Sequence, residues 1–328
     1  MSETVTLANG AVMPMLGLGT WQATDEEELE GALNAALDAG YRFIDTAYLY
    51  ANEKTVGKVV KAWLDEGKVT REELFISTKL PMMGMREEDV SHFLGMSLEN
   101  LQLDYVDLYL VHVPFGMLRE AMQTTDDIKA GGVGTMALDM ETDHLAIWKA
   151  LEAEVEAGRA RAIGVSNFNE SQVQRILDNC TIPPANHQVE MHLYLQQKDL
   201  VAFCKDKGIT VTAYSPFGSP GSNKWLTTSK GEELPDLFSL PEVVEIADRY
   251  EKTPAQVLLR HFVQQGILAV PKSTNAARIQ KNIQIFDFEL TEEEVEVLSG
   301  LDRGEEGRIF TMKLIGGVED HPEYPWKT

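Results

Sequence analysis

Four side chains that can hold or exchange protons stand at or just beyond the ends of short apolar runs: Asp45, Tyr50, Lys79 and His112. The apolar runs are residues 41–44, 74–77 and 106–111. A carboxylate, a phenol, an ammonium and an imidazole delivered by successive strands are the parts of a proton-donating site. Each residue alone is more often structural than catalytic, so the chemistry depends on whether the fold brings the four together.

Strand-like and helix-like stretches alternate around these residues. Apolar runs predict strands near residues 15–18, 41–44, 74–77, 106–111, 160–165, 185–189, 210–214 and 268–270. Helical spacing predicts helices over residues 29–37, 91–103, 143–157, 170–178, 198–207, 254–264 and 276–282. About eight strands alternating with helices indicate an α/β fold, a (β/α)8 TIM barrel, in which functional groups gather beyond the carboxyl ends of the strands.

Two local signals refine the amino-terminal end of this prediction. The dipeptide Asn9-Gly10 favours a type I′ turn, so we expect an N-terminal β-hairpin. Thr24 and Glu27 have the spacing of a capping box at the start of the first helix, and Gly40 ends that helix.

Three stretches interrupt the alternation: residues 114–141, 215–240 and 301–328. Loops longer than about 12 to 15 residues are usually functional or disordered. The first two follow strands, so we expect long loops at the C-terminal face that wall a pocket. No Pro/Gly-rich linker divides the pattern, and we expect residues 1–328 to form a single domain.

Composition excludes several classes of partner. Asp plus Glu number 52 against 29 Lys plus Arg, a net charge of −23, which repels nucleic acid and anionic membranes. Cys180 and Cys204 are too few for a disulfide framework and lack metal-ligand spacing, which fits a reducing compartment. The chain shows no secretory signal pattern and no apolar stretch of about 18 residues. We expect a cytoplasmic protein with no bound metal and no nucleic-acid or membrane partner.

Six short motifs follow one another along the chain: Leu16–Trp21 (LGLGTW), Tyr41–Ala47 (YRFIDTA), Leu110–Pro114 (LVHVP), Gly164–Phe168 (GVSNF), Tyr214–Pro216 (YSP) and Pro271–Thr274 (PKST). In this order they resemble the signature of the aldo-keto reductases of the aldose reductase and aldehyde reductase type. The resemblance runs from about Leu7 to Leu301, nearly the whole chain. It implies an NADPH-dependent barrel enzyme.

The resemblance implies that Asp45, Tyr50, Lys79 and His112 form the catalytic tetrad of that family. Reducing a carbonyl requires a hydride at carbon and a proton at oxygen. Tyr50 would donate the proton, and the Lys79 ammonium would favour its phenolate and make it a better acid. Asp45 would hold Lys79 through a charge-assisted bond, while His112 would orient and polarise the carbonyl oxygen.

The nicotinamide cofactor is implied by the resemblance and not by a Rossmann motif. Gly17-Leu-Gly19 lacks the third glycine of that fingerprint, and Gly131–Gly134 lies in a loop. In the family an aromatic ring stacks on the nicotinamide and polar side chains hold its carboxamide; the matching residues here are Tyr214, Ser166, Asn167 and Gln188. The other implied cofactor positions are Thr20, Trp21, Asp45, Ser215, Phe217 and Ser219.

A basic cluster follows the last predicted strand: Lys272, Ser273, Arg278 and Asn282. Barrel loops and helix starts at this position commonly bind phosphate. Two cations suit the 2′-phosphate that separates NADPH from NADH. A solvated helix start with ordinary surface cations is the alternative.

The chain departs from the aldose-reductase-like pattern at several positions. Pro81 and Val113 stand where those relatives usually carry tryptophan. Lys281 replaces a glutamate that commonly meets the adenine. Gln22 stands where a lysine often reaches across the pyrophosphate, and the acid that would face it is replaced around Gly221 or Ser222. We therefore expect weaker retention of the cofactor.

We expect an apolar substrate pocket lined by Trp21, Leu49, Pro81, Val113, Phe115, Trp225 and Phe310. Met82, Met83 and Met85 could adapt to varied apolar ligands, or could simply fill gaps under a loop. The expected activity is reduction of aldehydes and ketones, with aromatic, long aliphatic or steroid-like carbonyls favoured over sugars.

Two other functions stay open. An NADP-dependent dehydrogenase of alcohols or hydroxysteroids would use the same residues, and such a barrel can also serve as a slow NADPH-binding scaffold or regulatory subunit. The complete tetrad favours the reductase. The chain has no heptad seam or self-association stripe, and we expect a monomer.

Overall fold

A computed structural model describes residues 3–118, 137–220, 233–313 and 315–326 of the protein. Its main sheet has eight parallel strands in the spatial order β12-β11-β10-β9-β6-β5-β4-β3. They are β3 (Leu18–Gly19), β4 (Phe43–Asp45), β5 (Phe75–Leu80), β6 (Val106–Val111), β9 (Ala160–Ser166), β10 (Asn186–Glu190), β11 (Thr210–Tyr214) and β12 (Leu268–Ala269). The predicted strands are confirmed in order and close to their predicted bounds.

The two outer strands of this sheet, β3 and β12, meet and close the barrel. The Gly17 N–H donates to the Ala269 carbonyl oxygen at 2.9 Å, and the Ala269 N–H donates to the Met15 carbonyl oxygen at 3.0 Å. Two parallel bridges, Leu16 with Ala269 and Gly19 with Lys272, continue this seam. The (β/α)8 barrel predicted from the sequence is therefore confirmed, and within the described residues the seam pairs the two edges of the main sheet with each other.

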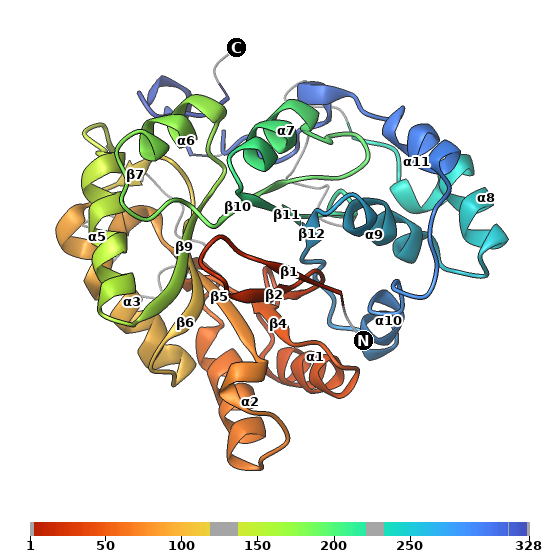
Figure 1. Ribbon diagram of the computed structural model, residues 1–328, viewed down its shortest axis with the longest axis horizontal. Coiled ribbons are helices and arrows are strands. Elements are labelled where there is room, and N and C mark those ends of the chain that lie inside the picture. The colour runs from red at the N-terminus through yellow and green to blue at the C-terminus, as the bar shows by residue number, and fades with distance from the viewer. Residues whose placement is uncertain (1–2, 119–136, 221–232, 314, 327–328) are drawn as a thin grey trace.

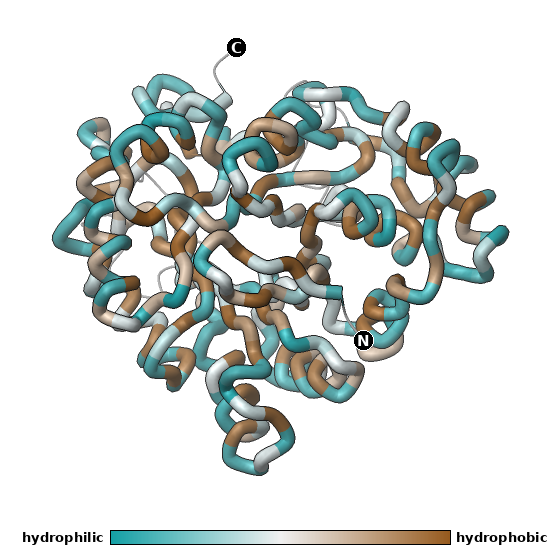
Figure 2. Tube along the Cα trace, viewed as in Figure 1, coloured by the Kyte–Doolittle hydropathy of each residue, from teal (hydrophilic) through white to brown (hydrophobic). Residues whose placement is uncertain are grey.

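Helices surround the strands (Figure 1). They are α1 (Glu26–Asp38), α2 (Glu53–Asp65), α3 (Glu87–Leu101), α5 (His144–Glu156), α6 (Glu170–Leu177), α7 (Lys198–Asp206), α8 (Pro241–Arg249), α9 (Pro254–Gln264), α10 (Ala276–Asn282) and α11 (Glu292–Ser299). Hydrophobic and hydrophilic residues recur along each helix, as an amphipathic cover over a barrel requires (Figure 2). Helices α2, α8 and α11 were not predicted from the sequence.

The first helix begins one residue later than the predicted capping box implies. The side chain of Asp25, not Thr24, accepts the Glu28 backbone N–H at 2.8 Å and caps α1. Aspartate is a strong N-cap residue, so the pairing of Thr24 with Glu27 was the wrong choice of cap.

The predicted N-terminal hairpin is confirmed, but its turn type is wrong. Strands β1 (Thr4–Thr6) and β2 (Val12–Pro14) pair antiparallel. The Gly10 N–H donates to the Leu7 carbonyl oxygen, and Gly10 has a φ of 86° while Asn9 is not among the residues with positive φ. A type I′ turn needs positive φ at both central residues, so this loop is a different turn with a left-handed glycine at its end. The hairpin lies across the amino-terminal end of the barrel (Figure 1).

The irregular stretches build a cover at the opposite end of the barrel. In the first, β7 (Gly116–Met117) pairs antiparallel with β8 (Leu138–Asp139). A separate apolar cluster joins this stretch to the C-terminal segment: Val113, Phe115 and Met117 from the first, and Ile315, Val318 and Tyr324 from the second. The end of the chain is thus part of the structure around the carboxyl ends of the strands.

Close packing inside the barrel gives a stability prediction. A Cβ on Gly164, in β9, would lie 2.3 Å from the Asn186 carbonyl oxygen of the neighbouring strand. We expect Gly164→Ala to lower the free energy of unfolding by about 1–3 kcal/mol, because the overpacked strand pair must separate. Urea unfolding measures the change.

Gly31, in the middle of α1, is the matched control because a Cβ added there would have no neighbouring atom within 4 Å. Gly31→Ala should raise the free energy of unfolding by about 0.5–1 kcal/mol through helix propensity. Equal effects of the two substitutions would contradict the packing argument.

Candidate active site

The Lys79 ammonium is the centre of the candidate site. Strand β5 extends to Leu80, so Lys79 lies inside the strand and not beyond its end as predicted. Its Nζ donates to Asp45 Oδ1 at 2.7 Å, to the Thr46 carbonyl oxygen at 2.9 Å and to the Tyr50 hydroxyl at 3.2 Å. Three acceptors match the three N–H bonds of a charged ammonium.

Asp45, the last residue of β4, supplies the opposite charge. The Lys79 and Asp45 side chains are only 1% and 4% exposed. The second carboxylate oxygen, Oδ2, accepts from Ser77 Oγ at 2.7 Å and from Gln188 Nε2 at 2.8 Å. Because both oxygens are bonded, the carboxylate has a fixed orientation and holds Lys79 in place.

Tyr50 and His112 complete the cluster from two other elements. Tyr50 ends the short 3-10 helix Tyr48–Tyr50, which follows β4, and Ala51 then takes a left-handed φ of 53°. His112 follows β6 directly. The two rings lie edge to face with centroids 5.7 Å apart. All four residues that the sequence singled out are therefore in one place.

Burial controls the protonation of this cluster. It raises the pKa of the Tyr50 phenol well above its ordinary value, and the Asp45 charge raises it further. Burial also lowers the pKa of Lys79, which the Asp45 carboxylate opposes, and it lowers the pKa of His112 well below its ordinary value with help from Lys79. The prediction that Lys79 favours the Tyr50 phenolate concerns one influence on that pKa, and burial, which disfavours the phenolate, is the larger influence here. Near neutral pH the phenol keeps its proton and the imidazole is neutral.

The polar residues expected around a nicotinamide adjoin the tetrad. Asn167 Nδ2 donates to the His112 carbonyl oxygen at 2.9 Å and contacts Ser166 Oγ at 3.1 Å. The Tyr214 hydroxyl donates to Asn167 Oδ1 at 2.8 Å. Gln188 reaches Asp45 as described above. Ser166 and Tyr214 end β9 and β11, Asn167 follows β9, and Gln188 lies inside β10, so the barrel brings all four toward the same mouth.

Several residues near this mouth have strained backbone conformations. Gln22, Asn167, Ser215 and Ser219 all have positive φ, between 51° and 64°. A non-glycine residue in this region costs about 1 kcal/mol or more and persists where surrounding contacts require it. Ser219 Oγ donates to Ser215 Oγ at 2.9 Å, and the Phe217 ring packs against Phe238 at 5.2 Å. The sequence had named these residues, but it did not reveal their strained backbone conformations.

The predicted phosphate cluster lies beside the closing seam of the barrel. Lys272 and Arg278 are exposed, whereas Ser273 and Asn282 are buried. Ser273 Oγ accepts the Asn275 N–H at 3.2 Å. The pKa of Lys272 is lowered by partial burial and by the Arg278 charge, against the opposing effect of Glu28. The effect of the Arg278 charge on the pKa of Lys272 indicates that the two cations lie near each other.

The expected pocket residues differ in how deeply they are buried and in what they contact. Trp21 packs edge to face on Phe310 with ring centroids 5.3 Å apart, while Thr20 Oγ1 donates to the Asp45 carbonyl oxygen at 3.1 Å. Leu49 is half-buried, and Pro81 and Val113 are buried. Phe115 is fully buried beneath the C-terminal segment, where its ring contacts His321. Trp225 lies outside the described residues.

Two contributors to the tetrad were missed from the sequence. Ser77 donates to Asp45, and the Thr46 backbone carbonyl accepts from Lys79. Ser77 is the only one with a sequence signal, since it lies two residues before Lys79 on the same strand and therefore on the same face.

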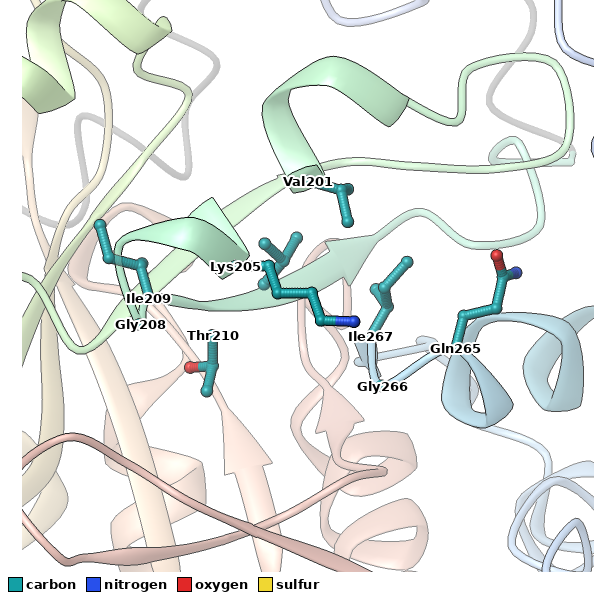
Figure 3. A pocket seen from close by; sticks show the side chains of 9 residues that line it. Val201, Lys205, Gly208, Ile209, Thr210, Gln265, Gly266 and Ile267 are labelled. Atoms are coloured by element: carbon teal, nitrogen blue, oxygen red, sulfur yellow. The ribbon is translucent and has the colours of Figure 1, made fainter. Parts of the chain in front are cut away.

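One cavity of about 270 Å³ lies at the opposite end of the barrel (Figure 3). Its walls come from the end of α7, the start of β11 and the turn before β12, with Lys205 extending toward Ile267. It is therefore separate from the tetrad. Across the described ranges no cluster of three or more His, Cys, Asp or Glu is arranged to hold a metal ion. Within the same ranges no helix has the length and apolarity needed to cross a membrane.

Comparison with known proteins agrees with this geometry. Residues 15–303 match the family model described as "Aldo/keto reductase family". The chain belongs to the aldo/keto reductase family. This aldo/keto reductase is 40% identical to aldo-keto reductase family 1 member A1-A of Danio rerio, over 99% of each chain. It is 39% identical to family 1 member A1 of Homo sapiens, over 98% of this chain and 97% of the relative.

Solved structures show the same likeness for this aldo/keto reductase. The aldose reductase of Schistosoma japonicum superposes with a TM-score of 0.86 at 38% identity, and 99% of each chain is covered. A Bombyx mori aldo-keto reductase, solved in complex with NADP, superposes with a TM-score of 0.86 at 35% identity and the same coverage. Family membership confirms the expected class, an NADPH-dependent oxidoreductase acting on carbonyl groups.

The buried ion pair at the centre of the site gives a second stability prediction. Asp45→Asn removes the charge that compensates the Lys79 ammonium, and we expect a loss of about 3–5 kcal/mol in the free energy of unfolding. Urea unfolding of the purified variant measures it.

Asp65→Asn is the matched control. Asp65 pairs with Lys61 at 2.9 Å, but the two side chains are 62% and 51% exposed, so we expect a loss of about 0.5 kcal/mol or less. A similar loss in both variants would show that burial does not decide the strength of the Asp45 pair.

Proposed function

We propose that this protein reduces aldehydes and ketones to alcohols with NADPH, and that Asp45, Tyr50, Lys79 and His112 carry out the proton transfer. The observation that carries the proposal is the hydrogen bond from Lys79 Nζ to the Tyr50 hydroxyl at 3.2 Å, inside a cluster that also holds His112. The same residues would catalyse the reverse oxidation of an alcohol.

The direction of the hydrogen bonds identifies Tyr50 as the acid. Lys79 donates all three of its N–H bonds, so the Tyr50 oxygen accepts from Lys79 and its own proton points elsewhere. A substrate oxygen within hydrogen-bond distance of Tyr50 would receive that proton. The adjacent ammonium then stabilises the phenolate that is left, in a buried site where such an interaction is strong.

His112 has the properties of a carbonyl-orienting group. Its ring is neutral near pH 7, and its Nδ1 is buried with no partner among the described residues. The ring lies edge to face with the Tyr50 ring, 5.7 Å between centroids, so the imidazole adjoins the place where a substrate oxygen would accept the Tyr50 proton. We infer that His112 orients the substrate oxygen toward Tyr50.

The surrounding residues fit NADPH. Tyr214 would stack on the nicotinamide, while Ser166, Asn167 and Gln188 would hold its carboxamide near Asp45. Thr20, Trp21, Ser215, Phe217 and Ser219 are the further cofactor residues of this proposal. When bound, NADPH supplies the hydride for the carbonyl carbon.

The exposed cations Lys272 and Arg278, with Ser273 and Asn282 beside them, are the proposed site for the 2′-phosphate. The binding of NADP by the Bombyx mori relative, which covers 99% of this chain, supports the assignment.

The proposed substrates are apolar carbonyls. Trp21, Leu49, Pro81, Val113, Phe115, Trp225 and Phe310 are the proposed wall, and the described members of this set offer rings and aliphatic groups with few hydrogen-bond donors or acceptors. Each methylene that a substrate buries there is worth about 0.8 kcal/mol. A sugar would lose hydrogen bonds to water in such a pocket without replacing them.

We also propose that the chain is one cofactor-binding domain over residues 1–328, that it acts as a monomer, and that it works in the cytoplasm. Cys180 and Cys204 are free thiols, which is consistent with a reducing compartment.

Loss of the phenolic hydroxyl tests the catalytic proposal. Tyr50→Phe should lower kcat for a reactive aldehyde by at least about 100-fold, because general acid catalysis contributes about that much or more. The measurement is the decrease in NADPH absorbance.

Tyr48→Phe is the matched control, since Tyr48 lies in the same 3-10 helix and its hydroxyl contacts the Met96 sulfur at 3.9 Å, away from Lys79. If wild type and both variants bind NADPH with negligible turnover, the protein is a binding scaffold and the proposal is wrong. Full activity in Tyr50→Phe would assign the acid to another group.

A substrate comparison tests the pocket. We expect kcat/KM for 2-naphthaldehyde to exceed that for glucose or xylose by at least about 100-fold, since several apolar groups gain about 0.8 kcal/mol each on burial. A clear preference for the sugars would refute the apolar pocket while leaving the tetrad chemistry intact.

A further inference from the structure

Glu190, the last residue of β10, is a buried carboxylate that the proton-transfer chemistry does not use. Its side chain is 0% exposed. Oε1 accepts the Ile309 N–H at 2.8 Å, and Oε2 accepts the Phe310 N–H at 2.9 Å. His192 Nε2 lies 3.1 Å from Oε1. Both oxygens of a barrel-strand residue are therefore bonded to the backbone of the C-terminal segment.

Phe310, whose backbone Glu190 holds, lies beside the candidate site. The Phe310 ring lies edge to face with Trp21 at 5.3 Å and with Tyr214 at 5.4 Å between centroids. Tyr214 in turn bonds Asn167, and Asn167 bonds the His112 carbonyl oxygen. A displacement of Phe310 would thus change the surface beside the tetrad.

Other contacts hold the same stretch of chain, residues 303–310, against the segment that follows β10. The Arg303 N–H donates to the Tyr194 carbonyl oxygen at 3.0 Å. A Cβ on Gly307 would lie 2.0 Å from that same oxygen, so the two backbones are in close contact. Arg308, which is buried, donates to Gln197 Oε1 at 3.2 Å. In Figure 1 the C-terminal segment, in blue, runs past α7 toward α6.

A carboxylate is suited to this position for a chemical reason. Two adjacent backbone N–H groups need two acceptors, and a carboxylate offers one on each oxygen. A glutamine would present one acceptor and one NH₂ group, which would face an N–H as a second donor. A buried charge is expensive, so its use here indicates that the position of these two residues matters more than the cost.

We propose that Glu190 is a specificity-determining positioning residue: it fixes the Ile309–Phe310 backbone so that the Phe310 ring forms an apolar wall of the substrate pocket. The inference rests on the proposed function, because it assigns that pocket to the carbonyl substrate. Glu190 itself contacts neither substrate nor cofactor and acts only through Phe310.

The test compares a large and a small aldehyde, 2-naphthaldehyde and propanal, with NADPH in the full-length protein. Glu190→Gln should raise KM for 2-naphthaldehyde by about 10-fold, the effect of losing one well-packed apolar contact, with a much smaller change in kcat. The KM for propanal, which is too small to reach the Phe310 wall, should change far less.

A double-mutant cycle separates positioning from general damage. Phe310→Ala should reproduce the selective rise in KM, and adding Glu190→Gln to Phe310→Ala should have little further effect, because the two residues act through one contact. Glu154→Gln is the control for loss of a buried carboxylate, since Glu154 lies on the outer helix α5 and pairs with Arg159, which follows that helix. It should leave both KM values unchanged.

Gly307→Ala provides a second way to displace the same segment if Glu190→Gln does not fold, and it should give the same selective rise in KM. The inference is overturned if the effect of Glu190→Gln persists in full on the Phe310→Ala background. It is also overturned if kcat falls equally for both aldehydes, or if Gly307→Ala folds and leaves the KM for 2-naphthaldehyde unchanged. A wild-type enzyme that reduces neither aldehyde would instead refute the proposed function, and this inference with it.

Discussion

The ion pair between Lys79 and Asp45 is the interaction on which the site depends. A charged ammonium is stable in the barrel interior only because a carboxylate, a backbone carbonyl and a phenol oxygen surround it. Those three partners come from β4 and the segment after it, whereas Lys79 comes from β5. The neighbouring strands must therefore be paired in register before the site exists.

Burial has two opposite effects on this cluster. It keeps the Tyr50 phenol and the His112 imidazole neutral, which by itself would make Tyr50 a weaker acid. It also removes water from around Lys79, so the attraction between the ammonium and a developing phenolate is stronger than it would be in solution. The resting site thus holds the proton firmly, and the stabilisation by Lys79 acts when the proton leaves.

Much of this arrangement could be predicted from the sequence, because short apolar runs mark the barrel strands and the tetrad follows their ends. Helix α2 could also have been found, since Val56, Val59, Val60 and Trp63 have the spacing of a buried helix face. The alternation of strands and helices does not specify which segments meet in space. The bond from Glu190 to residues 309 and 310 joins positions more than a hundred residues apart, and no local pattern indicates it. The strained conformations of Asn167 and Ser215 were equally invisible, because they are imposed by tertiary contacts and not by the residues themselves.

The seam between β3 and β12 has a consequence for how the molecule is made. It pairs residues near position 17 with residues near position 269. Strand β3 can therefore pair with β4 early, but it cannot pair with β12 until most of the polypeptide has been synthesised. During that interval β3 has an open flank, which is a target for association with other nascent chains. Contacts of such long sequence separation also make folding slow. The flank of β3 therefore closes only when β12 pairs with it, and the barrel cannot be complete before the last strand of the sheet has been synthesised.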